Sequence, residues 1–591
     1  MKTRTLILIS SFAIAFFLTV NQASAMEFHV TTASEFQAAL SAAGSNGGDD
    51  TIFMDAGIYY GNFRFTTGEA YALTIKPEAD AEEGSVILDG QKLGYVIRLD
   101  GNGLDVNFFL EGLVIQNGNS LEHGGGIYAK QSGGTGSFYV RNSNIINNKA
   151  KSEGGGAYVQ GFSSVKFEDS TLSCNNADGY GGGIRSGESA IFTRNTISGN
   201  TSSYGGGIFS GNSCSFINNM ITGNTSVTYG GGIFAGDFCT LTNNTITGNT
   251  SGGGGGLYSD NLCIITNNII SGNISWGTGG GVFSGSESSF TKNTISGNTS
   301  QNGGGVVSSR DCIFTNNIII GNTSSGEVGG VYFLGTVTFI NNNIIGNIGS
   351  GIVGKEAGYD GPGFVTLISN NVSANSEEGI NIPYIALTAT NNTIALNGGI
   401  GLFASPGRKA ITNIYNNIIW GNKAGGDESD VYMAGYGAES NFYNNLYTSA
   451  FAIWDNEGGN LIVDPLFHDP ENGDFHVSSG SPALNAGLNT APEISDTDLD
   501  GNPRIIDGIV DIGAYERSTT ALHPADLNGN WVIELTEFNS YNDAWRANTD
   551  WANEPNPVPM DYVTRAGYLL QKGGGYQNIG VGKPATWVPS N

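Results

Sequence analysis

The amino-acid sequence predicts an all-β solenoid, a parallel β-helix in which short strands stack coil upon coil. A Gly-Gly-Gly-aliphatic stretch and an Ile-x-Gly-Asn turn recur in step, and from Gly183 onward the interval alternates between 24 and 25 residues. Two features that keep the same step over nine units indicate a repeat architecture. The unit is rich in Gly, Asn and β-branched residues, which disfavour helices, so helical repeats are excluded. The turn asparagines are Asn148, Asn175, Asn200, Asn224, Asn249, Asn273, Asn298, Asn322 and Asn347.

The inward positions follow from this register. Ile or Leu stands three residues before each turn Asn, a large apolar residue stands eight before it, and a smaller residue stands ten before it. Positions two apart in a strand face the same side, so the last two positions both point into the core. One coil cannot bury its apolar face alone, and stacking creates the core. The column eight before the turn is expected to contain Val140, Phe167, Phe192, Phe216, Leu241, Ile265, Phe290, Phe314 and Phe339.

The turn residues and the cysteines receive structural interpretations. Stacked turn Asn side chains are expected to form an amide ladder, and the glycine beside each is expected to take a positive φ. Cys214, Cys239, Cys263 and Cys312 share the column ten residues before the turn. Parallel side chains disfavour the disulfide dihedral angle, and a straight column cannot surround a metal ion. We therefore expect buried free thiols that behave as small hydrophobes.

Charge and composition exclude several classes of function. Lys and Arg total 25 against 53 Asp and Glu, which gives a net charge of −28. Nucleic-acid binding and docking to anionic lipid both need basic surfaces, so neither is expected. Residues 1–25 have a basic start, an apolar stretch and the small-residue site Ala23-Ser24-Ala25, which predict a signal peptide. No later stretch has the length of a membrane span. The protein is expected to be secreted, extracellular or on the outer cell surface.

Local signals divide the chain further. Thr32-Ala-Ser-Glu35 is a capping box that predicts a short helix, which we expect to cap the first coil. Residues 517–524 have the composition of a linker. The predicted organisation is a signal peptide at 1–25, an N-terminal cap and first coils at 26–100, β-helix repeats at 101–455, terminal coils and an end segment at 456–516, and a dockerin-like segment at 525–591.

The repeat resembles known families. Gly205-Gly-Gly-Ile208 with Phe216-Ile-Asn-Asn219 resembles the repeat of chlamydial polymorphic outer-membrane proteins. The body, roughly residues 27 to 516, is similar to the pectin-lyase-like right-handed parallel β-helix superfamily. Val510-Asp-Ile-Gly-Ala-Tyr-Glu516, with the motifs before it, looks like the end segment of many secreted bacterial β-helix proteins. The resemblance implies a right-handed single-stranded parallel β-helix in an exported bacterial protein, and it implies no reaction.

The best candidate for ion binding lies near the C-terminus. A 12-residue loop from Asp526 to Glu537 places oxygen ligands at the spacing of a Ca²⁺ loop, and a helix is expected to follow it. Trp531 stands where Gly usually makes the sharp turn, and the alternative is an Asx-rich turn without metal. The loop resembles one half of a type I dockerin, which implies a cohesin-like partner, although residues 561–577 show no second loop. The predicted Ca²⁺ ligands are Asp526, Asn528, Asn530, Val532 through its carbonyl, Glu534 and Glu537.

An aromatic column is the candidate for ligand binding. It lies two residues after the third glycine of each unit, beside an inward aliphatic residue, so strand alternation turns it outward. Exposed stacked aromatic rings bind sugars or another protein. The alternative is a ladder of rings that only stabilises the sheet, which is the preferred interpretation. The candidate ligand-binding residues are Tyr128, Tyr158, Phe209, Phe234, Tyr258, Phe283 and Tyr332.

These observations favour a non-catalytic extracellular binding or adhesion scaffold that displays a long face to a glycan or a surface protein. The alternative is a polysaccharide lyase or glycoside hydrolase acting on an extracellular acidic polysaccharide; a third possibility is a structural surface-layer protein. Lyases of the resembling superfamily use Ca²⁺-binding acids with an Arg or Lys base, and its hydrolases use paired Asp. The sequence shows no such constellation, and His123-Gly-Gly-Gly126 is interpreted as a turn. No catalytic residue is assigned; a cluster of Asp, Lys or Arg on adjacent coils would favour an enzyme.

Overall fold

The computed structural model describes residues 25–578 and 587–589, with internal gaps at 83, 103, 132–134, 357–362, 408–409, 435–438, 452–453, 479, 518–521, 531 and 554–556. The predicted signal peptide, apart from Ala25, lies outside the described residues, as do much of the predicted linker and Trp531.

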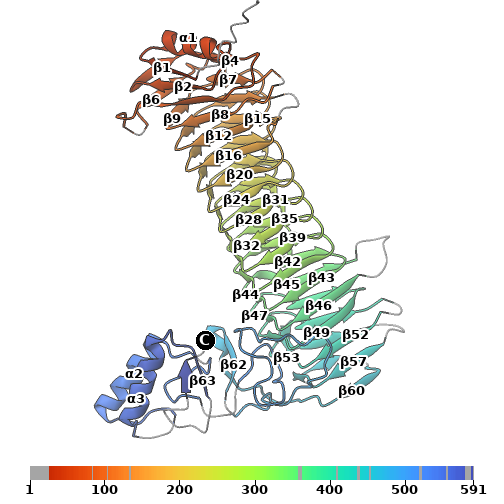
Figure 1. The fold of residues 1–591 in the computed structure, drawn as a ribbon. Helices are drawn as coiled ribbons and strands as arrows, with labels where there is room; N and C mark the ends of the chain where they lie inside the picture. The colour runs from red at the N-terminus through yellow and green to blue at the C-terminus, as the bar shows by residue number, and fades with distance from the viewer. Residues whose placement is uncertain are drawn as a thin grey trace, which may run out of the picture.

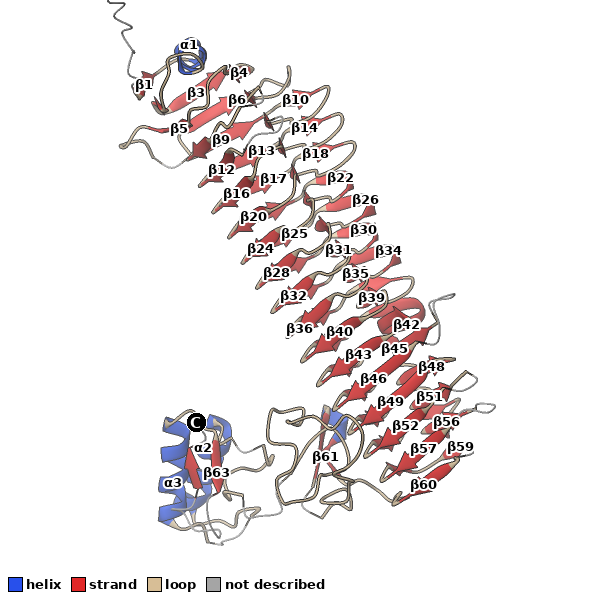
Figure 2. Cartoon of the chain, turned by 45° about the vertical axis from the view of Figure 1, so that its right-hand side comes forward, coloured by secondary structure: helices blue, strands red, loops and turns tan. Residues whose placement is uncertain are grey.

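The body is a stack of coils whose strands form three parallel sheets, A, B and C (Figures 1 and 2). The coil at 190–209 contributes β20 (Ala190–Thr193) to sheet A, β21 (Thr196–Ser198) to sheet B, and both β22 (Thr201–Tyr204) and β23 (Ile208–Phe209) to sheet C. Within the described residues, the sheets contain 18, 16 and 24 strands respectively. Sheet C has more strands because the Gly-Gly-Gly corner divides its contribution from each middle coil into two arms. The predicted all-β parallel solenoid is confirmed.

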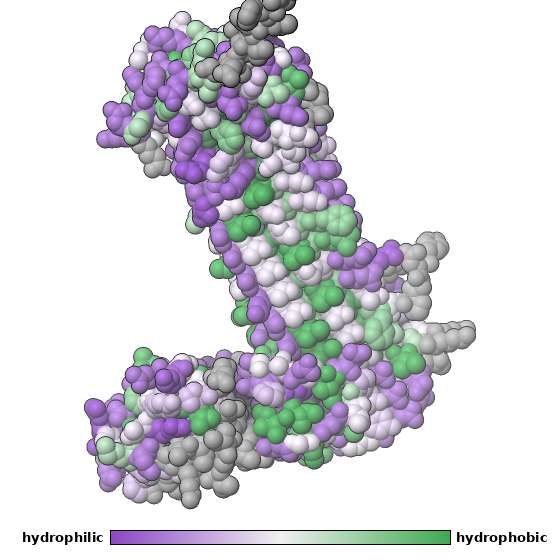
Figure 3. Space-filling view, viewed as in Figure 1, coloured by the Kyte–Doolittle hydropathy of each residue, from purple (hydrophilic) through white to green (hydrophobic). Residues whose placement is uncertain are grey.

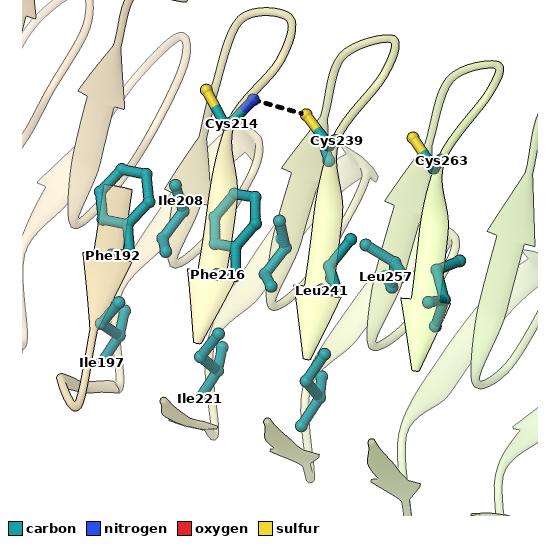
Figure 4. Close-up of a cluster of buried hydrophobic side chains, with 14 of the residues drawn as sticks. Phe192, Ile197, Ile208, Cys214, Phe216, Ile221, Cys239, Leu241, Leu257 and Cys263 are labelled. Carbon is teal, nitrogen blue, oxygen red and sulfur yellow. Dashed lines mark hydrogen bonds between the residues drawn. The ribbon is translucent and has the colours of Figure 1, made fainter. Parts of the chain in front are cut away.

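The core consists of the predicted inward columns. Phe192, Phe216, Ile197 and Ile221 are fully buried and stand above one another on successive coils (Figure 4). Where Phe follows Phe, the rings stack with centroids 5.1 Å apart at Phe192–Phe216 and 4.5 Å apart at Phe290–Phe314. Such pairs add about 0.5–1.5 kcal/mol beyond the area that they bury. The same core runs through the whole stack of coils.

Asparagine ladders hold two corners of the coils, one from Asn148 onward and the other from Asn195 onward. In the predicted turn ladder, Asn249 Oδ1 accepts hydrogen bonds from the backbone N–H and the side-chain amide of Asn224 at 2.9 and 3.0 Å. The Asn249 amide in turn donates to the carbonyl oxygen of Ile221 at 2.9 Å and to Asn273 Oδ1 at 3.0 Å. A second ladder, at the corner between sheets A and B, begins at Asn195 and Asn219 and makes the same bonds. The glycine before the turn Asn has a positive φ, for example +63° at Gly223 and Gly248.

The four column cysteines are buried free thiols, as predicted. The Cys214 backbone N–H donates to Cys239 Sγ at 3.3 Å (Figure 4). Each thiol therefore serves as an acceptor for the coil before it, and Ser288 does the same for Cys263 at 3.2 Å. Cys174, outside this column, is exposed.

The two ends of the stack are different in kind. At the N-terminus, α1 (Ala33–Ala43) begins with the predicted capping box, and its residues Phe36 and Leu40 are buried in the core. At the C-terminus, β60 (Asn456–Gly458) is the last strand that pairs with the three sheets. Residues 456–461 still form part of a coil, since β60 pairs with β57 (Ser440–Tyr443) and Leu461 bridges to Leu446. The described residues of 462–516 lie beside the last coils (Figure 2). Val477, Ala483 and Ile512 pack there on Ile418 and Leu446, on the outer side of sheet B.

A two-helix unit projects from the foot of the stack (Figure 1). It contains α2 (Leu535–Ala547) and α3 (Met560–Gln571), and it has a core of its own that includes Ile533, Tyr541 and Leu569. A two-stranded antiparallel sheet, β63 (Tyr576–Asn578) with β64 (Trp587–Pro589), completes the unit. None of the three described α-helices is both long and apolar enough to cross a membrane.

Ionisable side chains form a hydrogen-bonded network within the end segment. His476 Nδ1 lies 2.5 Å from Asp474, and its Nε2 lies 2.7 Å from Asp500; His468 contacts the other oxygen of Asp474 at 2.8 Å. Burial alone would lower the pKa of His476, but the hydrogen bonds to Asp474 and Asp500 outweigh it and raise this pKa to about 9. Burial would raise the pKa of Asp474, but His476 outweighs it and lowers that pKa to about 2. The ring of Tyr515 covers the imidazole at 4.1 Å between centroids.

The amide ladder yields a first test. Asn249→Ala leaves the Asn224 donors and the Ile221 carbonyl without partners in a buried site, and it is expected to lower the free energy of unfolding by about 3 kcal/mol or more. Thr247→Ala, on the same coil but facing outward, is expected to cost less than about 0.5 kcal/mol. Denaturant unfolding measures both. Equal costs for the two variants would contradict the role of the ladder.

The His476 network yields a second test. The folded-state pKa of His476 is about 9, above the ordinary 6.5. Protonated His476 therefore stabilises the fold fully below about pH 6.5, and this stabilisation is lost as the pH rises through 9. The lowered pKa of Asp474 acts at the other end: its contribution is lost as the pH falls from about 4 toward 2. Hydrogen exchange at β62 (Asp474–Val477) is expected to speed up between pH 7 and 10, beyond the intrinsic rate, in the wild type. In His476→Gln this excess should be absent, and an equal excess in both proteins would refute the assignment.

Candidate functional site

The outer side of sheet C carries a trough that runs along the stack. Its two arms meet at the Gly-Gly-Gly corner, where a Cβ on Gly205 would stand 2.4 Å from the carbonyl oxygen of Ile208 and one on Gly206 would stand 2.4 Å from that of Gly231. Only glycine fits this corner. Rings from the two arms touch across it, Tyr180 with Phe209 at 4.8 Å and Tyr229 with Tyr258 at 4.8 Å between centroids. Outward side chains can converge in this way only where the surface is concave, and we call this surface the aromatic trough.

The predicted aromatic column lies in register along the trough. Phe209, Phe234, Tyr258 and Phe283 pair strand by strand, with ring centroids 4.6 to 4.9 Å apart. These four rings and Tyr332 are half-buried, whereas Tyr128 and Tyr158 are 8% and 6% exposed, less than an exposed column implies. Val307 interrupts the stack before Tyr332. Apolar residues are conspicuous over the middle of the body in the space-filling view (Figure 3).

A charged cluster caps the N-terminal end of this column. Arg98 and Arg185 occupy the same outward column as Tyr128 and Tyr158, in the order Arg98, Tyr128, Tyr158, Arg185 on four successive coils. The guanidinium of Arg98 lies 4.4 Å from the centroid of the Tyr128 ring. The imidazole of His123 stacks on Tyr158 at 4.6 Å between centroids. We call Arg98, His123, Tyr128, Tyr158 and Arg185 the Arg–Tyr cluster.

Glu153 organises the cluster. Its carboxylate lies 3.4 Å from Arg185 Nε and 4.0 Å from His123 Nδ1. That nitrogen of His123 is buried and makes no hydrogen bond in the structure, and the same holds for Arg98 Nε. The side chains of Arg98, Arg185 and His123 remain 20 to 34% exposed, so all three can reach a ligand. A cleft of about 500 Å³, lined in part by Gln160, borders Arg185.

Burial sets the acidity of the two phenols. It raises the pKa of Tyr158, to which the charge of Glu153 adds and from which that of Arg185 subtracts. Burial likewise raises the pKa of Tyr128, partly offset by Arg98. Both phenols are therefore neutral proton donors at neutral pH. Two guanidinium groups beside an imidazole and two phenols can hold a carboxylate and move a proton near it.

The sequence did not single out this cluster. The steps Arg98→Tyr128→Tyr158→Arg185 are longer than the 24 to 25 residues of the regular repeat, and the coil of Arg98 lacks the glycine triplet. His123 was interpreted as a turn residue only. The signal that could have found the cluster is the strand alternation Ile97-Arg98-Leu99, which matches Ile127-Tyr128-Ala129.

The predicted Ca²⁺ loop is closed by its own hydrogen bonds. Glu537 accepts from the backbone N–H groups of Leu527, Asn528 and Glu534 at 3.0 to 3.3 Å. Asp526 accepts from Gly529 N–H at 2.8 Å and from the Tyr576 hydroxyl at 2.7 Å. Asn528 and Asn530 accept from the N–H groups two residues on, Asn530 and Val532. Within the described residues, no three Asp, Glu, His or Cys side chains gather as metal ligands. Ca²⁺ binding by Asp526, Asn528, Asn530, Val532, Glu534 and Glu537 stays a prediction.

A second cleft lies between the end segment and this loop. It has a volume of about 430 Å³ and is lined by Asp474, His476, Asp500 and Tyr515 from one side and by Asn528, Asn530 and Val532 from the other. The acidic groups that face it are already bonded to His476. The cleft therefore belongs to the network that fastens the end segment, and the Arg–Tyr cluster is the stronger candidate site.

Comparisons with known proteins concern the fold. The A-module of an Azotobacter vinelandii mannuronan C-5 epimerase, AlgE6, is 13% identical over 73% of this chain and 95% of its own, with a TM-score of 0.33. The periplasmic alginate epimerase AlgG is 12% identical over 70% and 85%, with a TM-score of 0.27, and pectate lyase Pel9A is 12% identical over 84% and 98%, with a TM-score of 0.18. No curated protein matches the chain. The family model of the right-handed β-helix region matches residues 95–258 and 206–359, which lie within the stack of parallel coils.

Proposed function

We propose that this protein binds an extracellular acidic polysaccharide along the aromatic trough and cleaves it at the Arg–Tyr cluster by β-elimination. The supporting observation is that Arg98 lies over Tyr128 and His123 stacks on Tyr158, with Arg185 next in the same column, where it pairs with Glu153 and lies over Phe209. A cluster of this kind is the feature that distinguishes an enzyme from a scaffold on this fold. The geometry thus favours the enzymatic alternative over the non-catalytic scaffold that the sequence favoured.

The roles follow from the chemistry of each group. Arg98 and Arg185 stand three coils apart in the column and bind the carboxylates of different uronate units. Neutralising a carboxylate makes the proton on the adjacent carbon easier to remove. His123, whose side chain stays 34% exposed although its Nδ1 is buried toward Glu153, takes that proton through the other ring nitrogen. The electron pair forms the ring double bond, the glycosidic C–O bond breaks, and a neutral phenol of Tyr128 or Tyr158 gives a proton to the leaving oxygen. The aromatic column beyond Arg185 holds neighbouring sugar rings by stacking.

A non-catalytic binding role remains the second candidate. The column continues past the cluster as Phe209, Phe234, Tyr258 and Phe283, and further on as the stacked rings Phe403, Tyr432 and Phe451. A binding surface longer than a cleavage site needs would suit an adhesion protein that holds a glycan or a surface protein. In that case the Arg–Tyr cluster would bind uronate without turning it over.

The remaining parts receive proposals of their own. We propose that the mature chain is secreted and that α1 caps the first coil against edge pairing. The two-helix unit docks to a cohesin-like partner on the cell surface when Ca²⁺ occupies the loop. Glu534 is the N-cap of α2, and Glu537 is the third residue of that helix. In this proposal Glu537 is the last ligand of the loop, the carboxylate that closes the Ca²⁺ site.

The cluster is tested with purified protein on alginate and polygalacturonate, by the ultraviolet absorbance of the unsaturated product. His123→Gln is expected to lower turnover by about 100-fold or more with little change in binding, because it removes only the base. Arg98→Gln with Arg185→Gln is expected to weaken both binding and turnover, the binding loss shrinking at high salt. Arg194→Gln is the matched control, since that arginine pairs with Glu168 and Asp169 at a different corner.

The outcomes separate the two candidates. Turnover that is unchanged in His123→Gln would refute the catalytic assignment. Binding that requires Arg98 and Arg185, with no product from any uronate polymer, would support the adhesion role. New reducing ends without unsaturation would indicate hydrolysis instead of elimination.

The Ca²⁺ loop is tested by calorimetry on the full mature chain. The wild type is expected to bind one Ca²⁺, and Glu537→Gln, which keeps the size of the side chain but removes its charge, is expected to weaken binding by at least about tenfold. Glu493→Gln, an exposed carboxylate in the end segment, is the matched control and should leave binding unchanged. Absence of heat with the wild type would remove the Ca²⁺ proposal.

A further inference from the structure

The end segment is held on the last coils by three outward side chains of a single corner between sheets A and B. Thr390 Oγ1 donates to the carbonyl oxygen of Pro492 at 2.6 Å, and the Asn391 amide donates to that of Asp511 at 2.9 Å. Thr393 Oγ1 accepts from the backbone N–H of Ala514 at 3.0 Å. All three bonds go to main-chain atoms of the bound segment. The polar groups of this corner thus bind the polypeptide backbone of the segment.

The next corner along the stack repeats this recognition. The Asn416 side chain donates to the carbonyl oxygen of Leu488 at 3.1 Å and accepts from the N–H of the same residue at 2.7 Å. Asn444 donates to the carbonyl oxygen of Ala486 at 2.9 Å. Asn391, Asn416 and Asn444 all have φ between +51° and +56°, a conformation that Asn tolerates and that turns its amide outward. Covered by the segment, Asn391 and Asn416 are fully buried.

The same four-residue sequence occurs on a coil whose outer corner no described residue covers. Thr242-Asn243-Asn244-Thr245 is identical to Thr390-Asn391-Asn392-Thr393. Thr242 and Thr390 stand in one column of sheet A, and Thr245 and Thr393 stand in one column of sheet B. Asn243 has a φ of +57°, matching the +56° of Asn391, but its side chain is exposed. The pairs Thr266-Asn267 and Thr315-Asn316 extend the same row, also with exposed Asn.

Apolar anchors accompany the polar row in both places. On the covered coils, Ile418 in the outer column of sheet B packs against Ala483 and Ile512 of the end segment. On the uncovered coils, Ile269 and Ile318 occupy that column and are 50% and 42% exposed. The uncovered row therefore offers the hydrogen-bonding groups and the apolar contacts that already hold a peptide segment elsewhere on the molecule.

We propose that the corner row centred on Thr242–Thr245, with Asn267 and Asn316, binds an extended polypeptide segment of another protein through its main-chain atoms. The segment that fits has small apolar side chains, as the bound end segment has, and is neutral or acidic, because the charged corner residue between Asn267 and Asn316 is Lys292. A second copy of this chain offers no free segment of this kind among the described residues, since residues 486–514 are already engaged with their own coils. The site is on a different face from the aromatic trough.

The probe is a pair of fluorescent synthetic peptides with the sequences of residues 485–497 and 508–517, added to the full mature chain and followed by anisotropy. Saturable binding is expected. The triple variant Thr242→Val, Asn243→Gly, Thr245→Val removes the three hydrogen-bonding groups, while glycine keeps the positive φ. It is expected to weaken binding by about tenfold or more, because each lost hydrogen bond contributes about 1 kcal/mol. Thr240→Val with Thr247→Val removes two outward hydroxyls of the same coil beside the row and should bind as the wild type does.

Sedimentation of the protein without peptide completes the test. A monomer that binds peptide at the row supports the proposal. Lack of saturable binding to the wild type, or equal binding by the triple variant, would overturn it. A dimer that the triple variant dissolves would overturn it as well, since the row would then be the contact between two copies of this chain.

Discussion

Superposition of equivalent side chains on successive coils is the constraint on which the rest of this structure depends, and the asparagine ladders enforce it. Each ladder Asn bonds to the next coil through the backbone and the side chain at once, so a coil that slipped by one residue would lose several buried hydrogen bonds. Apolar stacking alone is less selective, since Phe, Leu and Ile alternate in the same column without disturbing it. The ladders supply register, and the apolar columns supply most of the driving force.

The functional surfaces follow from that register. A residue placed once per coil on the outer side becomes a column, whatever its chemistry, so single substitutions in a repeat build extended surfaces. Rings in the column beyond the Gly-Gly-Gly corner give the aromatic trough, and arginines at two positions of the same column give the Arg–Tyr cluster. The threonines and asparagines of the corner between sheets A and B arise in the same way. Among the described residues, the corners that bond to the end segment are those of Asn341, Ser369, Asn391, Asn416 and Asn444.

The sequence predicts the regular part of this molecule well and the irregular part poorly, for physical reasons. The positions occupied by Ile197, Phe216 and Asn224 recur at a regular interval of 24 or 25 residues. In a parallel stack that interval determines which side chains lie on one another. Arg185 stands in the predicted column, two residues after Gly183, whereas Arg98 escapes prediction because its coil lacks the glycine triplet that marks the column. The second ladder was visible as the Asn of Phe-x-x-Asn but was not interpreted. Residues 461–516 have no repeat at all, so neither their return along the last coils nor the contact of His476 with Asp500, 24 residues away, could be foreseen.

Spin-label distances along one outer column would test the superposition most directly. With Cys174 replaced by serine, nitroxides are placed in pairs at position 318 and at 220, 196 or 171 in turn, all in one outward column of sheet B. These pairs are four, five and six coils apart, so the mean distance should grow by about 4.8 Å with each coil, in a straight series. Distances that do not grow in equal steps, or that fall as the sequence separation rises, would contradict the superposition of coils and every surface built on it.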